Sequence, residues 1–411
     1  MTGSDTEDGS TGWITGLGVV APNGIGAEEY WKATLEGRSG LRTITGFDAG
    51  QYPVRVAGEV GTFADEPSLS GRILPQTDRM TRYALVASDW ALADSGVRTD
   101  EHDGFSTGVI TASAAGGFEF GQRELQKLWG SGPGEVSAYQ SFAWFYAVNT
   151  GQISIRHGLR GHSSVAVAEQ AGGLDAVAQA TRLVDHGTLR VAVAGGFEAP
   201  VSPWGLVAQI PSGLLSTVAD PARAYLPFDP DASGWVPGEG GAALVVERAA
   251  DARARGADHV YGRIAGHAST FDPRPGLGRP PALARAVRTA LDRARTHPGD
   301  IDVVFADAAG LPEQDAAEVA ALTEVFGSRK VPVTAPKTMT GRLYSGGGAL
   351  DTATALLALR DGVVPPTVGT RTAPPELDLV LGAPRDLPLR NALVLARGTG
   401  GFNSAVVVAR V

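Results

Sequence analysis

Residues 164–173 (SVAVAEQAGG) run an apolar, strand-like stretch into a turn of small residues, and from Leu174 onward the apolar spacing is that of a helix. A strand that breaks sharply into a helix points the helix N-terminus at the side chain on the apex of the turn. The free N–H groups and the positive end of the helix dipole at that point stabilise a thiolate or an oxyanion. The stretch therefore predicts an α/β fold with a seat for a nucleophile.

The residue at this apex is Gln170. Its side-chain amide has no proton to lose near neutral pH and no useful nucleophilicity. The 411 residues include no cysteine, which excludes disulfides and thiolate metal sites. The sequence thus predicts the architecture of a covalent enzyme from which the reactive atom has been removed.

Composition narrows the class of protein. With 43% hydrophobic and 19% charged residues, the chain is long enough for two core-bearing domains or one large two-lobed unit. A net charge of −9 argues against a nucleic-acid partner. No window approaches the roughly 18 apolar residues that span a bilayer. Residues 1–11 are polar and acidic and indicate a disordered tail on a cytoplasmic protein. No two histidines have the spacing that would place them together on a helix as metal ligands.

The chain also repeats itself weakly. Four segments have counterparts in the same order: 13–18 with 262–267, 108–113 with 303–308, 173–187 with 348–362, and 242–247 with 404–409. This indicates two copies of one α/β unit, residues 12–255 and 256–411. The apolar runs 191–194 and 392–395 fit strands buried on both faces, hence layered α/β/α packing. Residues 201–240, rich in Pro, Gly and Ser, are expected to form a functional loop.

Several motifs together carry a family resemblance. They are 15–20 (TGLGVV), 227–229 (PFD) followed by 238–241 (GEGG), Lys337 before a glycine-rich helix, and 398–404 (GTGGFNS). In this order they resemble the β-ketoacyl synthases of the thiolase superfamily along nearly the whole chain. Residues 167–173 (VAEQAGG), 141–150 (SFAWFYAVNT) and 151–161 (GQISIRHGLRG) make the chain similar to the chain length factors, or ketosynthase β subunits, of type II polyketide synthases.

The resemblance implies the thiolase fold, with two duplicated α/β halves in a five-layer α/β/α/β/α arrangement. It also implies a heterodimer with a ketosynthase α subunit that serves an acyl carrier protein and a growing polyketide chain. The carrier would hold the phosphopantetheine arm, so no cofactor is expected on this chain. Arg156 or Arg160 would meet the carrier's acidic surface.

The same resemblance implies a vestigial condensation site. Active synthases have cysteine where this chain has Gln170, and histidines where it has Ala309 and Arg342, whereas Lys337 and Glu318 are retained. A Claisen condensation needs a thiolate to hold the acyl chain and neutral donors or bases to stabilise the enolate. Alanine offers neither, and arginine is a permanent cation that cannot shuttle protons. No catalytic residue for condensation is therefore expected.

Two alternatives stay open for the remnants of this site. The Gln170 amide could mimic a thioester carbonyl and promote malonyl-carrier decarboxylation, which would supply a primer, or it could be a filler that satisfies backbone donors of the vacated pocket. The filler is favoured, because the two histidines that normally support decarboxylation are absent from this chain. Lys337 and Glu318 are either a catalytic relic or a buried ion pair, and we expect the pair.

Residues 118–129 (FEFGQRELQKLW) predict a helix. At about 100° per residue, one face carries Phe118, Gly121, Gln122, Leu125 and Trp129. The plain interpretation is that this face packs against the core or a partner.

The resemblance implies that Phe118, Gly121 and Leu125, with Phe142 nearby, line the closed end of the polyketide tunnel. A mid-helix glycine costs roughly 1 kcal/mol against alanine, so something needs the space at Gly121. The hypothesis is that Gly121 and the non-aromatic Leu125 deepen the tunnel and lengthen the product.

The glycine-rich stretch 398–401 would, by the same resemblance, close over the pocket and supply a backbone N–H for an oxyanion; it is not a dinucleotide fingerprint. Two rival functions remain. One is a hydrolase that uses Ser164 or Ser345, although no His/Asp set is readable near either. The other is a homodimeric scaffold that binds acyl chains.

Overall fold

Two six-stranded sheets organise the chain in the computed structural model, which describes residues 9, 11–61, 69, 71–274 and 278–411. Most of the expected N-terminal tail, residues 1–8 and 10, lies outside this range. The first sheet has the order β2 (Gly24–Ile25), β1 (Gly12–Ala21), β8 (Gly240–Arg248), β7 (Val191–Glu198), β5 (Thr107–Ala112), β6 (Ser163–Ala166). The second has the order β13 (Asp378–Leu379), β11 (Pro332–Thr334), β10 (Val303–Phe305), β15 (Asn391–Gly398), β16 (Phe402–Ala409), β9 (Arg263–Phe271).

The two sheets repeat one strand order. The run β1-β8-β7-β5-β6 of the first sheet is matched by β9-β16-β15-β10-β11 in the second. The segments paired by sequence fall on equivalent elements: β1 with β9, β5 with β10, β8 with β16, and helix α6 (Gly172–Asp185) with α11 (Ser345–Asp361). β7 is buried along its whole length, as is the 392–396 part of β15. The expected duplicated α/β fold is confirmed.

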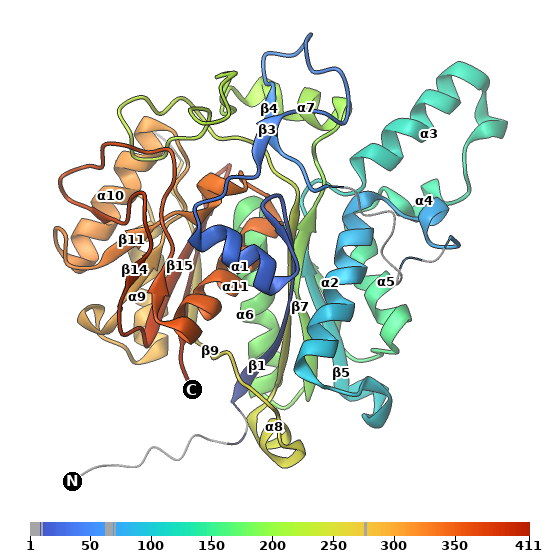
Figure 1. Cartoon of the computed structure of the whole chain (residues 1–411). Helices are drawn as coiled ribbons and strands as arrows, with labels where there is room; N and C mark the ends of the chain where they lie inside the picture. Colours follow the sequence, from blue (N-terminus) through green and yellow to red (C-terminus); the bar gives the residue numbers. More distant parts are fainter. Residues whose placement is uncertain (1–8, 10, 62–68, 70, 275–277) are drawn as a thin grey trace.

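Five layers result. Helices α6 and α11 lie between the sheets (Figure 1), and their apolar residues share one core cluster with residues of β7, β8 and β15. The outer face of the first sheet is covered by α2 (Arg79–Ser95) and α5 (Val148–His157). The outer face of the second is covered by α9 (Leu283–Ala294) and α10 (Pro312–Phe326).

Glycines let the two central helices approach closely. A Cβ on Gly173 would lie 2.2 Å from the carbonyl oxygen of Ser345, and one on Gly348 would lie 2.9 Å from the backbone nitrogen of Leu174. Any larger residue at these two positions would push α6 and α11 apart. The glycines that open both helices therefore bring the N-terminal ends of α6 and α11 together, and the candidate site lies there.

An arm stands out from this body. Helix α3 (Phe118–Ser131) projects away from the sheets, with α4 (Gln140–Ala143) at its foot (Figure 1). The segment expected to be a loop, 201–240, holds helix α7 (Pro203–Gln209) beside α3 and is otherwise irregular before β8. The other elements are α1 (Ala27–Leu35), β3 (Leu41–Thr43), β4 (Val56–Gly58), α8 (Ala249–Arg255), β12 (Val363–Val364) and β14 (Arg385–Asp386). Among the described helices, none is long and apolar enough to cross a membrane.

Candidate functional site

The turn after β6 forms as the sequence predicts. A single 3-10 turn, Glu169–Ala171, joins β6 to α6, and Gln170 lies buried at its apex. The helix begins at Gly172, two residues earlier than expected, because both glycines take helical conformations against α11. Within the described part of the chain, the Gln170 amide nitrogen has no hydrogen-bond partner. Backbone donors could be satisfied only by the amide oxygen, so this unpaired nitrogen does not test the filler hypothesis, which stays a prediction.

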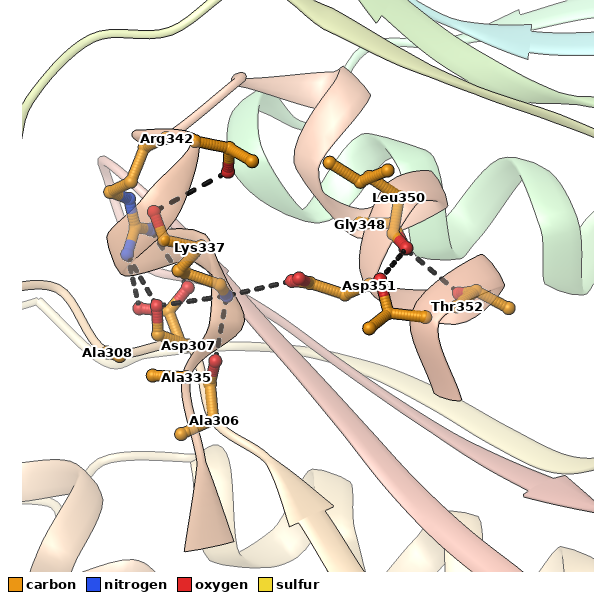
Figure 2. A network of polar contacts seen from close by, with 12 residues as sticks. Ala306, Asp307, Ala308, Ala335, Lys337, Arg342, Gly348, Leu350, Asp351 and Thr352 are labelled. Carbon is orange, nitrogen blue, oxygen red and sulfur yellow. Dashed lines mark hydrogen bonds and ion pairs between the residues drawn. The ribbon is translucent and has the colours of Figure 1, made fainter. Parts of the chain in front are cut away.

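Arg342 fills the place next to the apex. Its guanidinium forms a bidentate ion pair with Asp307, at 2.8 and 3.1 Å (Figure 2). It also donates to the Asp307 and Arg397 carbonyl oxygens at 2.8 and 3.0 Å. Arg342 and Asp307 are both buried. Burial acts to raise the pKa of Asp307, but Arg342 and then Lys337 outweigh it and hold that pKa below its usual value. This position carries a fixed charge pair in place of a proton carrier.

Lys337 pairs with a different carboxylate from the one expected. Its Nζ lies 2.8 Å from Asp351 Oδ2 on α11, and it donates to the carbonyl oxygens of Ala306 and Asp307 at 2.7 and 3.1 Å (Figure 2). Glu318 instead accepts the backbone N–H groups of Asp307 and Ala308, at 2.7 and 2.8 Å. The predicted Lys337–Glu318 pair is therefore wrong.

The correction has a physical reason. Glu318 lies on α10, on the outer side of the 307–310 turn, where two backbone donors of that turn satisfy its carboxylate. Burial, followed by the nearby Asp307 charge, raises the pKa of Glu318 to about 7. Asp351 lies on the inner side, in the second turn of α11, where the Lys337 ammonium needs a counter-charge.

The space left between these groups is very small. A cavity of about 10 Å³ is lined by Gln170, Asp307, Lys337, Arg342, Asp351 and their neighbours on the 340–350 stretch. That volume is about what one water molecule needs. Ala309 is buried and contributes no polar side chain. The pocket therefore holds no room for a malonyl thioester.

The serine alternative finds no support in the geometry. The Ser345 hydroxyl, buried at the first turn of α11, donates to the Glu169 carbonyl oxygen at 2.9 Å. Ser164 Oγ accepts from Gln179 Nε2 at 3.0 Å. Neither bond involves the imidazole–carboxylate pair that activates a serine nucleophile.

The predicted face of α3 is only partly covered in this chain. Helix α3 buries Phe120, Gly121 and Glu124, whereas Phe118, Gln122 and Leu125 are half-buried and Trp129 is 82% exposed. Phe142, on α4, packs against the core cluster around α2. On this face Trp129 and part of Leu125 remain accessible to a partner or a ligand.

The need for glycine at position 121 comes from a neighbouring residue, Trp204, that the sequence analysis did not identify. A Cβ at Gly121 would lie 2.8 Å from Cζ3 of Trp204 on α7. The Trp204 ring also stacks on Phe118, with centroids 5.5 Å apart, and the Trp204 backbone N–H donates to Gln122 Oε1 at 2.8 Å. The space expected to deepen a tunnel is therefore filled by Trp204, which is 37% exposed.

The two candidate docking arginines differ. Arg156 forms a bidentate ion pair with Asp89, at 2.8 and 2.6 Å, so its charge is already engaged. Arg160 is exposed. Of the two, Arg160 has the more accessible charge.

Comparisons with known proteins agree with this geometry. Residues 13–252 match the beta-ketoacyl synthase N-terminal domain, and residues 261–371 match its C-terminal domain. The chain belongs to the β-ketoacyl synthase family. Among solved structures, it is similar to the ishigamide ketosynthase/chain length factor, with a TM-score of 0.89 and 27% identity over 98% of this chain and 99% of that one.

Sequence relatives narrow the subfamily. The chain is 67% identical to the tetracenomycin polyketide synthase ketoacyl synthase beta subunit of Streptomyces glaucescens, over 97% of this chain and 98% of that one. It is 59% identical, over the same shares, to the actinorhodin polyketide putative beta-ketoacyl synthase 2 of Streptomyces coelicolor. Identity to a putative polyketide beta-ketoacyl synthase 1 of Streptomyces virginiae is 34%, over 96% of each chain. The chain is thus a ketosynthase β subunit of the chain length factor type.

Proposed function

We propose that this β-ketoacyl synthase family member is the non-condensing subunit of a type II polyketide ketosynthase–chain length factor heterodimer. In it the partner performs condensation, and this chain closes and shapes the polyketide tunnel. One observation carries the proposal: the position of the nucleophile is filled by Gln170 beside two buried ion pairs, with a cavity of about 10 Å³. Chemistry that needs an acyl chain must therefore take place on another polypeptide.

The surface that would receive the partner surrounds strand β6. Among the described strands β6 is the last of its sheet, so one side of its backbone pairs with none of them. Large apolar side chains gather on the flanking segments: Ile155 is 79% exposed and Val167 is 52% exposed, and Trp144, Phe145 and Tyr146 are also exposed. An exposed strand edge next to apolar side chains is typical of an interface between chains.

The α3 arm would supply the tunnel wall. Phe118 and Leu125, with Gly121 and its neighbour Trp204, present a mixed aromatic and aliphatic face beside this surface. Flexible, apolar acyl intermediates are accommodated by such lining, and its bulk limits how far a chain can grow. A solved relative, a type II polyketide synthase acyl carrier protein in complex with its ketosynthase bound to the hexaketide, has a TM-score of 0.87 and 26% identity to this chain.

The decarboxylase alternative is the weaker proposal. It requires a malonyl thioester next to Gln170, and Arg342 with Asp307 occupies that space. Purified heterodimer carrying Gln170→Ala is expected to release CO₂ from malonyl-carrier at the rate of the unmodified heterodimer. Loss of CO₂ release in this variant would favour the decarboxylase.

Co-expression tests the main proposal. The chain, tagged, is expected to co-purify in equal amounts with an untagged cysteine-bearing ketosynthase, and the pair with a carrier protein is expected to yield polyketide. Mass analysis after turnover should find acyl groups on the partner and the carrier. A soluble homodimer that does not bind the ketosynthase, or an acyl group bound covalently to this chain, would contradict the proposal.

The proposal assigns no cofactor to this chain, because the phosphopantetheine arm would arrive on the carrier protein. It also includes the cytoplasmic location that the sequence suggested, which fractionation of the producing cells would test.

A further inference from the structure

Asp78 caps two helices with one carboxylate. It is the N-cap residue of α2, where its Oδ1 accepts the backbone N–H of Met80 at 2.9 Å. Its Oδ2 accepts the backbone N–H of Phe120, in the first turn of α3, also at 2.9 Å. Asp78 is buried. Both of its carboxylate oxygens are therefore engaged by backbone N–H groups, each from a different helix.

Helix α3 depends on this shared cap. The residue at its own N-cap position is Gly117, which has no side chain to accept a hydrogen bond. A Cβ on Gly117 would lie 3.0 Å from Cβ of Asp78 and 2.3 Å from the carbonyl oxygen of Ala143, so glycine lets the carboxylate approach the helix. An N-cap side chain normally accepts the N–H of the second or third helical residue, and Phe120 is the third residue of α3. Asp78 thus supplies the cap that the local sequence of α3 lacks.

The next residue, Arg79, connects the same point to two further segments. Its guanidinium lies 2.5 Å from Glu119 Oε2 in α3 and 2.7 Å from the buried Glu239, which comes just before β8. It also donates to the carbonyl oxygen of Val201 at 2.9 Å, two residues before α7 begins. The positions of α3 and α7 are therefore both fixed from the start of α2.

The length of the arm magnifies any change at this point. The buried residues of α3 (Phe120, Gly121 and Glu124) lie in its first two turns, and the rest of the helix projects from the body (Figure 1). A tilt of about 10° at the root would move Leu125, roughly 10 Å along the helix axis, by about 2 Å. A shift of that size would change how far an acyl chain can extend along this face.

We propose that Asp78 is a positioning residue for chain length: by capping α2 and α3 together, it fixes the angle of the α3 arm and with it the depth of the tunnel. This inference rests on the proposed function, in which α3 forms the tunnel wall. Asp78 acts through α3, because both of its carboxylate oxygens are engaged by backbone N–H groups.

Asp78→Asn tests the shared cap, because asparagine caps a single helix as well as aspartate does. Its side chain offers one acceptor oxygen and turns an NH₂ group toward the second backbone N–H. Helix α2 is packed on the first sheet, so α3 is the helix that should move.

Spin labels on the full-length chain measure this movement. The chain has no cysteine, so labels on Ala93→Cys in α2 and Ser131→Cys in α3 report the distance between these two helices alone. Both positions are exposed. The distance distribution is expected to shift or broaden in Asp78→Asn relative to the chain that retains Asp78.

Product length is the functional measurement. In the heterodimer reconstituted with its carrier protein, the share of products that differ in length from the main product should rise several-fold in Asp78→Asn, as read by mass spectrometry. Glu119→Gln breaks the ion pair with Arg79 at a half-buried side chain and should give a smaller rise. This second variant carries the test if Asp78→Asn does not fold.

Val287→Ala is the control for lost stability alone. It truncates a buried side chain on α9, in the other half of the chain, and should leave the spin-label distance and the product lengths unchanged.

An unchanged spin-label distance in both Asp78→Asn and Glu119→Gln would overturn the inference. A changed distance with unchanged product lengths, or an equal spread of lengths in Val287→Ala, would overturn it as well. If the unmodified chain does not bind the ketosynthase or supports no product, the proposed function is contradicted and the inference falls with it. The two failures are distinguishable, because the first appears only in the comparison of variants and the second in the unmodified protein.

Discussion

Replacing Gly121 by alanine should reveal whether Trp204 determines the shape of the tunnel face. The added Cβ would meet Trp204 Cζ3 at 2.8 Å, closer than carbon atoms pack, so the ring must move. Overpacking of this kind costs about 1–3 kcal/mol. Exchanging a mid-helix glycine for alanine returns about 1 kcal/mol. The net expectation for Gly121→Ala is a loss of roughly 0–2 kcal/mol.

In a Trp204→Ala background the clash is absent, and the same exchange should stabilise the chain by about 1 kcal/mol. The coupling free energy between the two positions is therefore expected to be about 1–3 kcal/mol. Loss of the stacking between Trp204 and Phe118 cancels in this comparison, because both Trp204→Ala proteins lack it. Urea unfolding of the four proteins measures the coupling.

Gly130→Ala is the matched control. Gly130 lies on the same helix, and a Cβ there would meet no atom within 4 Å. Its effect should be the same with and without Trp204. A coupling below about 0.5 kcal/mol for Gly121 and Trp204, within the error of additivity, would refute the packing argument. In the reconstituted synthase, Trp204→Ala should lengthen the product and Gly121→Leu should shorten it, as read by mass spectrometry.

Three other predictions address the buried charges and the partner surface. Asp351→Asn leaves the Lys337 ammonium without its counter-charge and should lower the free energy of unfolding by about 3 kcal/mol. Joint replacement of Asp351 by Leu and Lys337 by Met should restore most of this loss. An unchanged free energy of unfolding in Asp351→Asn would contradict the ion pair. Val167→Asp should abolish co-purification with the ketosynthase. It should change the chain's own urea midpoint little, since the Val167 side chain is 52% exposed. Co-purification of this variant would show that the interface lies elsewhere. Burial raises the pKa of Glu198 from 4.5 to about 8, so its contribution to stability is complete below pH 4.5 and is lost as the pH rises through 8. Between pH 5 and 8, the free energy of unfolding of Glu198→Gln should therefore rise relative to that of the unmodified chain, by up to about 1.4 kcal/mol per pH unit. A difference in urea unfolding that does not change with pH would contradict this.

The sequence predicted those parts of the site that depend on local pattern. The strand–turn–helix at Gln170 and the helix that begins at Phe118 both formed where apolar spacing and glycines indicated. The partner of Lys337 was beyond this reach, because Glu318 and Asp351 carry the same charge at comparable sequence distance. Only the side of the 307–310 turn on which each acid lies distinguishes them.

Trp204 and Glu169 were missed for related reasons. Trp204 is one aromatic residue in a stretch rich in Pro and Gly, and its contact with Gly121 joins segments more than 80 residues apart. Glu169 stood beside the quoted apex, and a charged residue before a helix start could have been read as an N-terminal anion. The Glu169 carboxylate accepts the backbone N–H of Thr399, which comes from the other half of the chain.

By itself the sequence determined the duplicated α/β fold, the position of the apex turn and the loss of its nucleophile, because strand and helix periodicities and residue chemistry are local properties. Tertiary structure alone decided what replaced the lost chemistry: the Lys337–Asp351 pair, Arg342 on Asp307, Trp204 against Gly121, and a cavity too small for a substrate. These depend on distances of about 3 Å between atoms far apart in the chain. Burial makes such contacts strong, and only the packed fold brings them together.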